Sequence, residues 1–247
     1  MSIAPLLPVA LPDVTPDELH PALWRASQLA RSVGRTVPTG LASLASNLPG
    51  GGWPMGTNID LLVSQPGIGE LRLVAPALRQ IAKRKIVLIN PPHQPQILGF
   101  ASQGIDAADL VWLRPSTTAD TLWAAEQVLR SGSCGAVLLW ANHARSESMR
   151  RLNLAAQTGG ETLFFLYRPL AAAQDPSPAQ LRLALRPALG GIEVTFLKRR
   201  GPQRDDPLIV PLPSPMPFKS PSPARERGPE RQHVAVARKE DFSTSIF

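Results

Sequence analysis

Short apolar runs that alternate with helical patterns constrain this chain more than any other feature of its sequence. From residue 57 onward, near-continuous hydrophobic runs recur, as they do in strands that are buried on both faces of a parallel sheet. The expected strands are Ile59–Ser64, Ile86–Asn90, Leu110–Leu113, Ala136–Ala141 and Thr162–Tyr167. The expected helices between them are Glu70–Lys85, Asp120–Ser131 and Ser146–Thr158. We therefore predict an α/β fold with a mostly parallel sheet and helices on both faces.

The pattern changes after residue 180 to alternating strands separated by turns that contain Pro187, Gly190 and Gly191. This change predicts an antiparallel edge added to the parallel sheet. The added strands are expected at residues 181–186, 192–199 and 208–212. Within the earlier helices, Pro76 predicts a kink and Gly132 predicts a left-handed cap.

Proline distribution sets the expected boundaries of the folded part. The chain of 247 residues holds 27 prolines, roughly twice the average share of about 5%, and they crowd toward both ends. We expect a flexible segment over residues 1–19, a helix in 20–37, one α/β domain over 38–213 and a disordered proline-rich tail over 214–247. A small helix and a glycine-rich turn are expected just before the first strand, within residues 38–56.

Charge and cysteine content limit the classes of ligand. The formal net charge is +7, and the only cysteine is Cys134, so no internal disulfide or cysteine-based zinc site is expected. The four histidines have no metal-ligand spacing, and we predict neither a metal nor a cofactor. A basic surface suits nucleic acid or an acidic partner, but it also suits simple solvation. The side chains best placed to touch nucleic acid are Lys83, Arg84, Lys85, Lys198, Arg199 and Arg200.

The N-terminal sequence argues against export. It carries no Lys or Arg before residue 25 and is interrupted by Pro5, Pro8 and Pro12, unlike a signal peptide. No apolar run approaches the 18 or so residues that a membrane span needs. We expect a cytoplasmic protein with no membrane contact.

One turn has the shape of a phosphate-binding loop without its chemistry. The stretch from Ser64 to Leu71, with Gly67 and Gly69, lies between the first strand and the first helix, where such loops occur. A working loop needs a lysine for the phosphates and a hydroxyl for magnesium, and Glu70 and Leu71 hold those positions. An ordinary turn that uses its two glycines explains the motif equally well.

The order of these elements resembles the RecA recombinase family from about residue 38 to about residue 212. The phrase from Thr39 to Gly56, including LPGGGWPMG, is similar to that family's lead-in to the first strand. The resemblance places the family's catalytic glutamate at Pro92 and its magnesium-associated aspartate at Trp140. With Glu70 and Leu71, four catalytic positions are lost, and phosphoryl transfer depends on such electrostatic groups. The resemblance therefore implies a RecA-like domain that is not an enzyme and has no cofactor.

Three further phrases are similar to the ImuA family of accessory proteins in SOS-induced mutagenesis. They are residues 67–73 (GIGELRL), 119–127 (ADTLWAAEQ) and 134–140 (CGAVLLW). This resemblance implies a role in translesion DNA synthesis, with location at the nucleoid during DNA damage. It implies partners, namely the inactive Y-family polymerase homologue ImuB and an error-prone replicative-type polymerase, with RecA and weak or indirect DNA contact as further candidates.

Two other readings stay open at this stage. A degenerate RecA-related domain also occurs in cell-division inhibitors of the SulA type, which act on the tubulin-like division protein. An ATPase is the third reading. At the end of the tail, Phe242, Ile246 and Phe247 are apolar anchors for partner binding, or an inert terminus.

Overall fold

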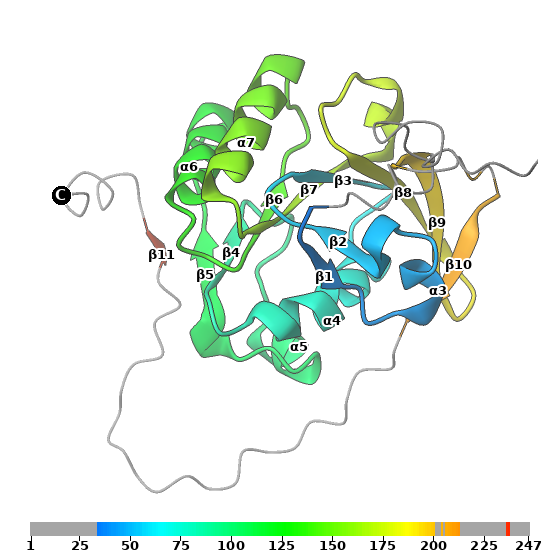
Figure 1. Ribbon diagram of the computed structural model, residues 1–247. Helices are drawn as coiled ribbons and strands as arrows, with labels where there is room; N and C mark the ends of the chain where they lie inside the picture. The colour runs from blue at the N-terminus through cyan, green and yellow to red at the C-terminus, as the bar shows by residue number, and fades with distance from the viewer. Residues whose placement is uncertain (1–33, 201–203, 205, 213–235, 238–247) are drawn as a thin grey trace, which may run out of the picture.

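A nine-stranded sheet forms the centre of the protein (Figure 1). The computed structural model describes residues 34–200, 204, 206–212 and 236–237. The strand order is β10-β9-β8-β3-β7-β6-β4-β5-β11. The strands are β3 (Asn58–Val63), β4 (Ile86–Ile89), β5 (Leu110–Leu113), β6 (Ala136–Trp140), β7 (Leu163–Pro169), β8 (Leu181–Ala188), β9 (Gly191–Lys198), β10 (Leu208–Pro211) and β11 (Val236–Ala237).

Strand directions confirm the predicted sheet. Every neighbouring pair from β8 to β5 is parallel, whereas β9 pairs antiparallel with both β8 and β10. All four residues of β4 are buried, which explains why its sequence, IVLI, is an unbroken apolar run. The α/β class, the mostly parallel sheet and the antiparallel edge are therefore correct.

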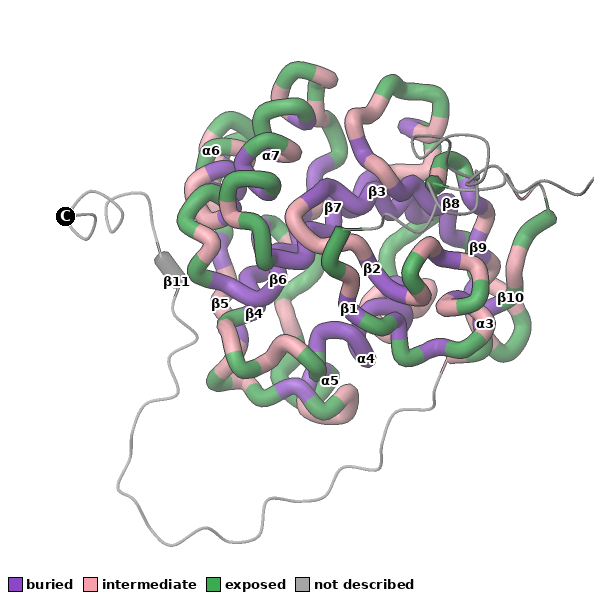
Figure 2. Tube along the Cα trace, viewed as in Figure 1, coloured by how far each residue is buried: buried purple, intermediate pink, exposed green. Residues whose placement is uncertain are grey.

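Helices cover both faces of the sheet and create two separate cores (Figures 1 and 2). Helices α4 (Glu70–Ile81) and α5 (Ile97–Ser102) contribute to one core, and α6 (Thr118–Ser131) and α7 (Ser146–Gly159) contribute to the other. Alternation along each strand separates the two sets, so that Val87 and Ile89 face α6 and α7 while Ile86 and Leu88 face α4.

The helix ends follow their local chemistry. Thr117 caps α6 by accepting a hydrogen bond from the backbone N–H of Asp120 at 3.1 Å, and Gly132 ends it in the left-handed conformation, as predicted. Helix α4 stops at Ile81, four residues before the predicted end, because the chain turns there to enter β4. It runs through Pro76 as one element, and the buried proline ring packs against Gly40.

At the start of the domain the predicted small helix is present, whereas the two short strands that flank it were not predicted. Strands β1 (Thr36–Pro38) and β2 (Gly52–Pro54) form a separate antiparallel pair around the small helix α3 (Ala42–Ala45), and Trp53 of β2 is buried. The predicted helix over residues 20–37 is wrong at Thr36 and Val37, which are extended because they pair with β2. Its residues up to 33 and the segment 1–19 lie outside the described part.

The tail prediction needs one correction. Val236 and Ala237 form β11, which pairs parallel with β5 opposite Trp112 and Leu113, because an edge strand offers unpaired backbone groups. The rest of residues 213–247 lies outside the described part. In the residues that the structure describes, none of the helices combines the length and apolar character that crossing a bilayer requires.

Candidate functional site

The loop between β3 and α4 lies at the carboxyl edge of the parallel strands. Gly67 and Gly69 adopt φ values of 86° and 103°, which favour glycine, and α4 begins directly after them at Glu70. The chain thus forms the strand, tight loop and helix arrangement that phosphate-binding loops use. Ser64 closes the end of the strand by donating its backbone N–H to the carbonyl of Leu185 at 3.1 Å.

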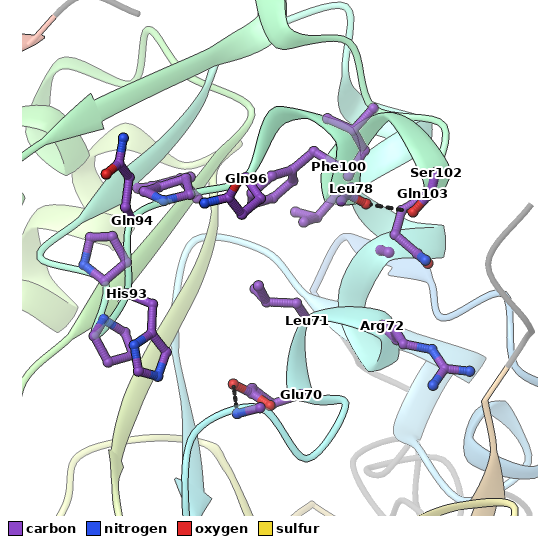
Figure 3. A pocket seen from close by; sticks show the side chains of 18 of the residues that line it. Glu70, Leu71, Arg72, Leu78, His93, Gln94, Gln96, Phe100, Ser102 and Gln103 are labelled. Carbon is purple, nitrogen blue, oxygen red and sulfur yellow. Dashed lines mark hydrogen bonds between the residues drawn. The ribbon is translucent and has the colours of Figure 1, made fainter. Parts of the chain in front are cut away.

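The Glu70 side chain fills the loop that precedes it. Its two carboxylate oxygens accept the backbone N–H groups of Gly67 and Gly69 at 2.9 and 3.1 Å, and the residue is buried. Figure 3 shows the Glu70 side chain at the start of the helix with one of these bonds. Backbone N–H groups at a helix N-terminus are the donors that would otherwise bind a phosphate. An internal carboxylate occupies them here, so a polyphosphate would have to displace a like-charged, hydrogen-bonded group.

The other positions to which the RecA resemblance assigns catalytic groups hold side chains without suitable oxygens. Leu71 lines an apolar pocket, and Pro92 lies exposed on the loop that follows β4. Trp140 stacks on Tyr167, with ring centroids 4.7 Å apart and an interplanar angle of 9°. Within the described ranges no group of three or more His, Cys, Asp and Glu side chains is arranged to hold a metal ion.

Tyr167, which stacks against Trp140, is a titratable group whose pKa is shifted at this site. Burial raises its pKa well above the ordinary value of 10.0, and the negative charge of Glu70 raises it further. Its hydroxyl is buried without a hydrogen-bond partner among the described residues.

We expect Tyr167→Phe to leave stability near neutral pH within about 1 kcal/mol of wild type, since it removes an unpaired buried hydroxyl. In the unfolded wild type the tyrosine ionises above about pH 10, while in the folded protein it stays neutral. The free energy of unfolding of the wild type therefore falls as the pH rises above about 10, and that of Tyr167→Phe lacks this fall. Urea unfolding at pH 7 and above pH 10 measures the difference. Parallel pH profiles for the two proteins would contradict it.

A pocket of about 410 Å³ opens beside the loop. Leu71 and Leu78 of α4 and Phe100 of α5 converge on it, and Leu88 and Ile105 also line it (Figure 3). Its rim is polar and comes from the segment between β4 and α5, with His93, Gln94 and Gln96. This pocket could not be predicted from the sequence, because the pattern of residues 97–102 did not indicate α5. A volume in this range accommodates a small ligand or a few apolar side chains.

The predicted nucleic-acid contacts lie elsewhere. Lys83, Arg84 and Lys85 directly precede β4. Lys198 ends the antiparallel β9, and Arg199 and Arg200 follow it, so both clusters are at the amino edge of the parallel strands. Four strands separate β4 from β9 in the sheet. The structure therefore brings the two clusters neither to the loop nor to each other.

Several of these basic side chains have internal roles. Arg84 donates to the backbone carbonyls of Gly132 and Glu161, and Lys85 donates to that of Ala108 at 2.6 Å. Lys198 donates to the carbonyl of Ser177 at 3.4 Å. The Arg199 guanidinium lies 5.0 Å from the centre of the Phe196 ring, and its pKa is lowered by burial and then by the charge of Arg204. These contacts join segments that are distant in the sequence at the amino edge of the sheet.

A buried ionic cluster, which sequence reasoning missed, lies on the sheet face opposite α4. Asp60 of β3 is fully buried, and its carboxylate lies 3.1 Å from Arg182 of β8 and 3.5 Å from Arg168 of β7. Arg168 also contacts the half-exposed Asp175 at 2.6 Å. The cluster fixes three neighbouring strands at one point.

The predicted partner-binding residues Phe242, Ile246 and Phe247 lie outside the described residues. The structure does describe β11, a few residues before them, next to β5.

Comparison with known proteins connects this fold to one group. No family model matches the chain. It is similar to the protein named cell division inhibitor SulA of Edwardsiella piscicida, with 33% identity over 125 residues, which are 46% of this chain and 74% of that protein. Identity at this level over about three quarters of the relative's length shows that the chain belongs to the family of the cell division inhibitor SulA.

Proposed function

We propose that this chain is a non-catalytic protein of the SOS response that acts by binding other proteins. The observation that carries the proposal is the Glu70 carboxylate, which occupies the loop's own N–H donors at 2.9 and 3.1 Å. The side chains at Leu71, Pro92 and Trp140 supply neither a metal ligand nor a base. A domain that has kept the loop's shape without these groups serves as a scaffold.

The SulA relative supports one candidate partner. That protein is named a cell division inhibitor, and the shared family suggests that this chain also blocks the tubulin-like division protein. Such inhibition needs a binding surface and no phosphoryl transfer, which agrees with the site.

A second candidate is the accessory role of the ImuA type, in which the chain assembles with ImuB and an error-prone replicative-type polymerase. The match to SulA accounts for 46% of the chain, whereas the structure forms a continuous α/β domain from β1 to β10. The phrases similar to ImuA lie in central elements of that domain, at the loop before α4, along α6 and on β6. This candidate places the protein in the cytoplasm at the nucleoid, near RecA and DNA.

Two assays on the purified full chain separate the candidates. We expect micromolar or tighter binding to ImuB by surface plasmon resonance, unchanged by ATP and magnesium, if the accessory role is correct. Suppression of nucleotide-dependent assembly of the division protein, measured by light scattering, would instead identify a division inhibitor. Failure in both assays, or binding that appears only with ATP, would refute the proposed function.

A further inference from the structure

We propose that the segment following β11 docks in the apolar pocket between α4 and α5 of its own chain, with Phe242 as the principal anchor. This intramolecular contact goes beyond the proposed function and does not depend on which partner the protein binds. Three observations support it, namely where the pocket lies, where β11 directs the chain, and which side chains come next.

The pocket is suited to an apolar side chain. Leu71, Leu78 and Phe100 converge on it from two helices, and the polar groups lie on its rim (Figure 3). The nearest carboxylate, Glu70, is already held by the loop's own N–H groups. The pocket therefore favours an uncharged occupant whose burial removes apolar surface from water.

Strand β11 directs the chain toward the pocket. It is parallel to β5, so the chain leaves it at the carboxyl edge of the sheet, where the pocket opens. The register places Ala237 level with Leu113, and Leu113 level with Ile89 of β4. Two strand spacings of about 4.8 Å separate Ala237 from Ile89, or roughly 10 Å. The pocket is lined by Leu88, next to Ile89, and by the segment that starts two residues after Ile89, at Pro91.

The residues after β11 have the necessary reach and composition. Four charged residues, 238–241, follow Ala237, and Phe242 is the first apolar side chain after them. Five residues span roughly 17 Å when extended, which exceeds the lateral distance. Ile246 is within reach by the same argument, so the two side chains can share the pocket. Burial of one phenylalanine favours the docked form by roughly ten- to a hundredfold.

Photo-cross-linking of the full chain tests this contact without any partner protein. We expect p-benzoylphenylalanine in place of Phe242 to form intramolecular cross-links to residues 91–103 or to the first turns of α4. The same group in place of Phe218, which precedes β11 in the proline-rich segment, serves as the control and should not react there. Cross-links that are equal from both positions, or that join two chains, would overturn the proposal.

A blocking variant gives a second, independent measurement. Gly99 lines the pocket, and an added Cβ meets only Gln96 Cβ, at 3.8 Å, so the backbone there tolerates a side chain and Gly99→Leu places an apolar group at the pocket. We expect it to reduce the Phe242 cross-links by roughly tenfold, in line with the burial estimate. Leu98→Gln alters an exposed neighbour that does not line the pocket, and should leave them unchanged.

Hydrogen exchange supplies the complementary readout. Replacing Phe242, Ile246 and Phe247 together by alanine should speed amide exchange in residues 91–103 and leave α7 unaffected. Unchanged exchange in residues 91–103 would contradict docking. A small molecule retained in the pocket, seen by native mass spectrometry in both forms, would replace the tail as the occupant and overturn the proposal.

Discussion

Replacement of Asp60 by alanine should lower the free energy of unfolding by about 3–5 kcal/mol, the cost of removing one partner from a buried ion pair. Asp60 is fully buried between Arg168 and Arg182, and both arginines are almost fully buried as well. Without the carboxylate, two guanidinium groups remain in the interior, with the half-exposed Asp175 as the nearest acid. The change in urea midpoint with an unaltered m-value would measure this loss.

Glu193→Ala is a matched control for the Asp60 variant. Glu193 pairs with Arg186 at 3.8 Å across β8 and β9, but the arginine side chain is half exposed. Exposed pairs contribute little, so this substitution should cost under about 1 kcal/mol. Asp60→Asn retains a hydrogen-bond acceptor and should fall between the two. Equal losses for Asp60→Ala and Glu193→Ala would show that the buried cluster does not hold the three strands together.

Glu70→Ala should destabilise the protein by about 3 kcal/mol, because two N–H groups lose an ionised acceptor and hydrogen bonds to charged groups contribute about 1.5–3 kcal/mol each. The same variant should show no ATP hydrolysis, since Leu71, Pro92 and Trp140 still lack the required oxygens. Urea unfolding measures the first effect, and a phosphate-release assay with magnesium measures the second.

Glu147→Ala provides the comparison for Glu70. Both residues are acidic and lie in the first turn of a helix, but Glu147 of α7 is exposed and Glu70 is not. An exposed acid at a helix start contributes about 0.3–1 kcal/mol through the helix dipole. Similar losses for both variants would show that the contacts to Gly67 and Gly69 add nothing. Hydrolysis by the wild type that disappears in Glu70→Ala would refute the scaffold proposal.

The sheet could be predicted because the local sequence of each buried strand is sufficient to identify it. A strand such as β4 is buried along its whole length and its sequence, IVLI, is an unbroken apolar run, so its position requires no knowledge of its neighbours. The short elements could not be predicted in this way. Strands β1 and β2 have three residues each, and α5 has six. These lengths are too short for the hydrophobic period of a strand or of a helix to be recognised. Their conformation depends on the partners they pack against.

The sequence shows which residues occupy the loop of the candidate site, but it does not show which contacts their side chains make. The substitution of Glu70 for a lysine was visible, but the return of its carboxylate to Gly67 and Gly69 depends on the folded loop. The cluster around Asp60 joins residues as far as 122 positions apart in the sequence. Arg84 looked like a surface charge, although its donors are used by carbonyl groups of distant turns.

The loop before α4 already holds an anion of its own chain, the Glu70 carboxylate, at the N–H groups that would bind a phosphate. Nucleotide-dependent switch proteins change conformation when the γ-phosphate binds and again when it is released, and this cycle controls when they bind their partners. In the proposed scaffold role, the Glu70 carboxylate holds the loop in one form that does not respond to the cellular ATP level. Synthesis and degradation of the protein would then set when its proposed partners are engaged, because no nucleotide has to bind.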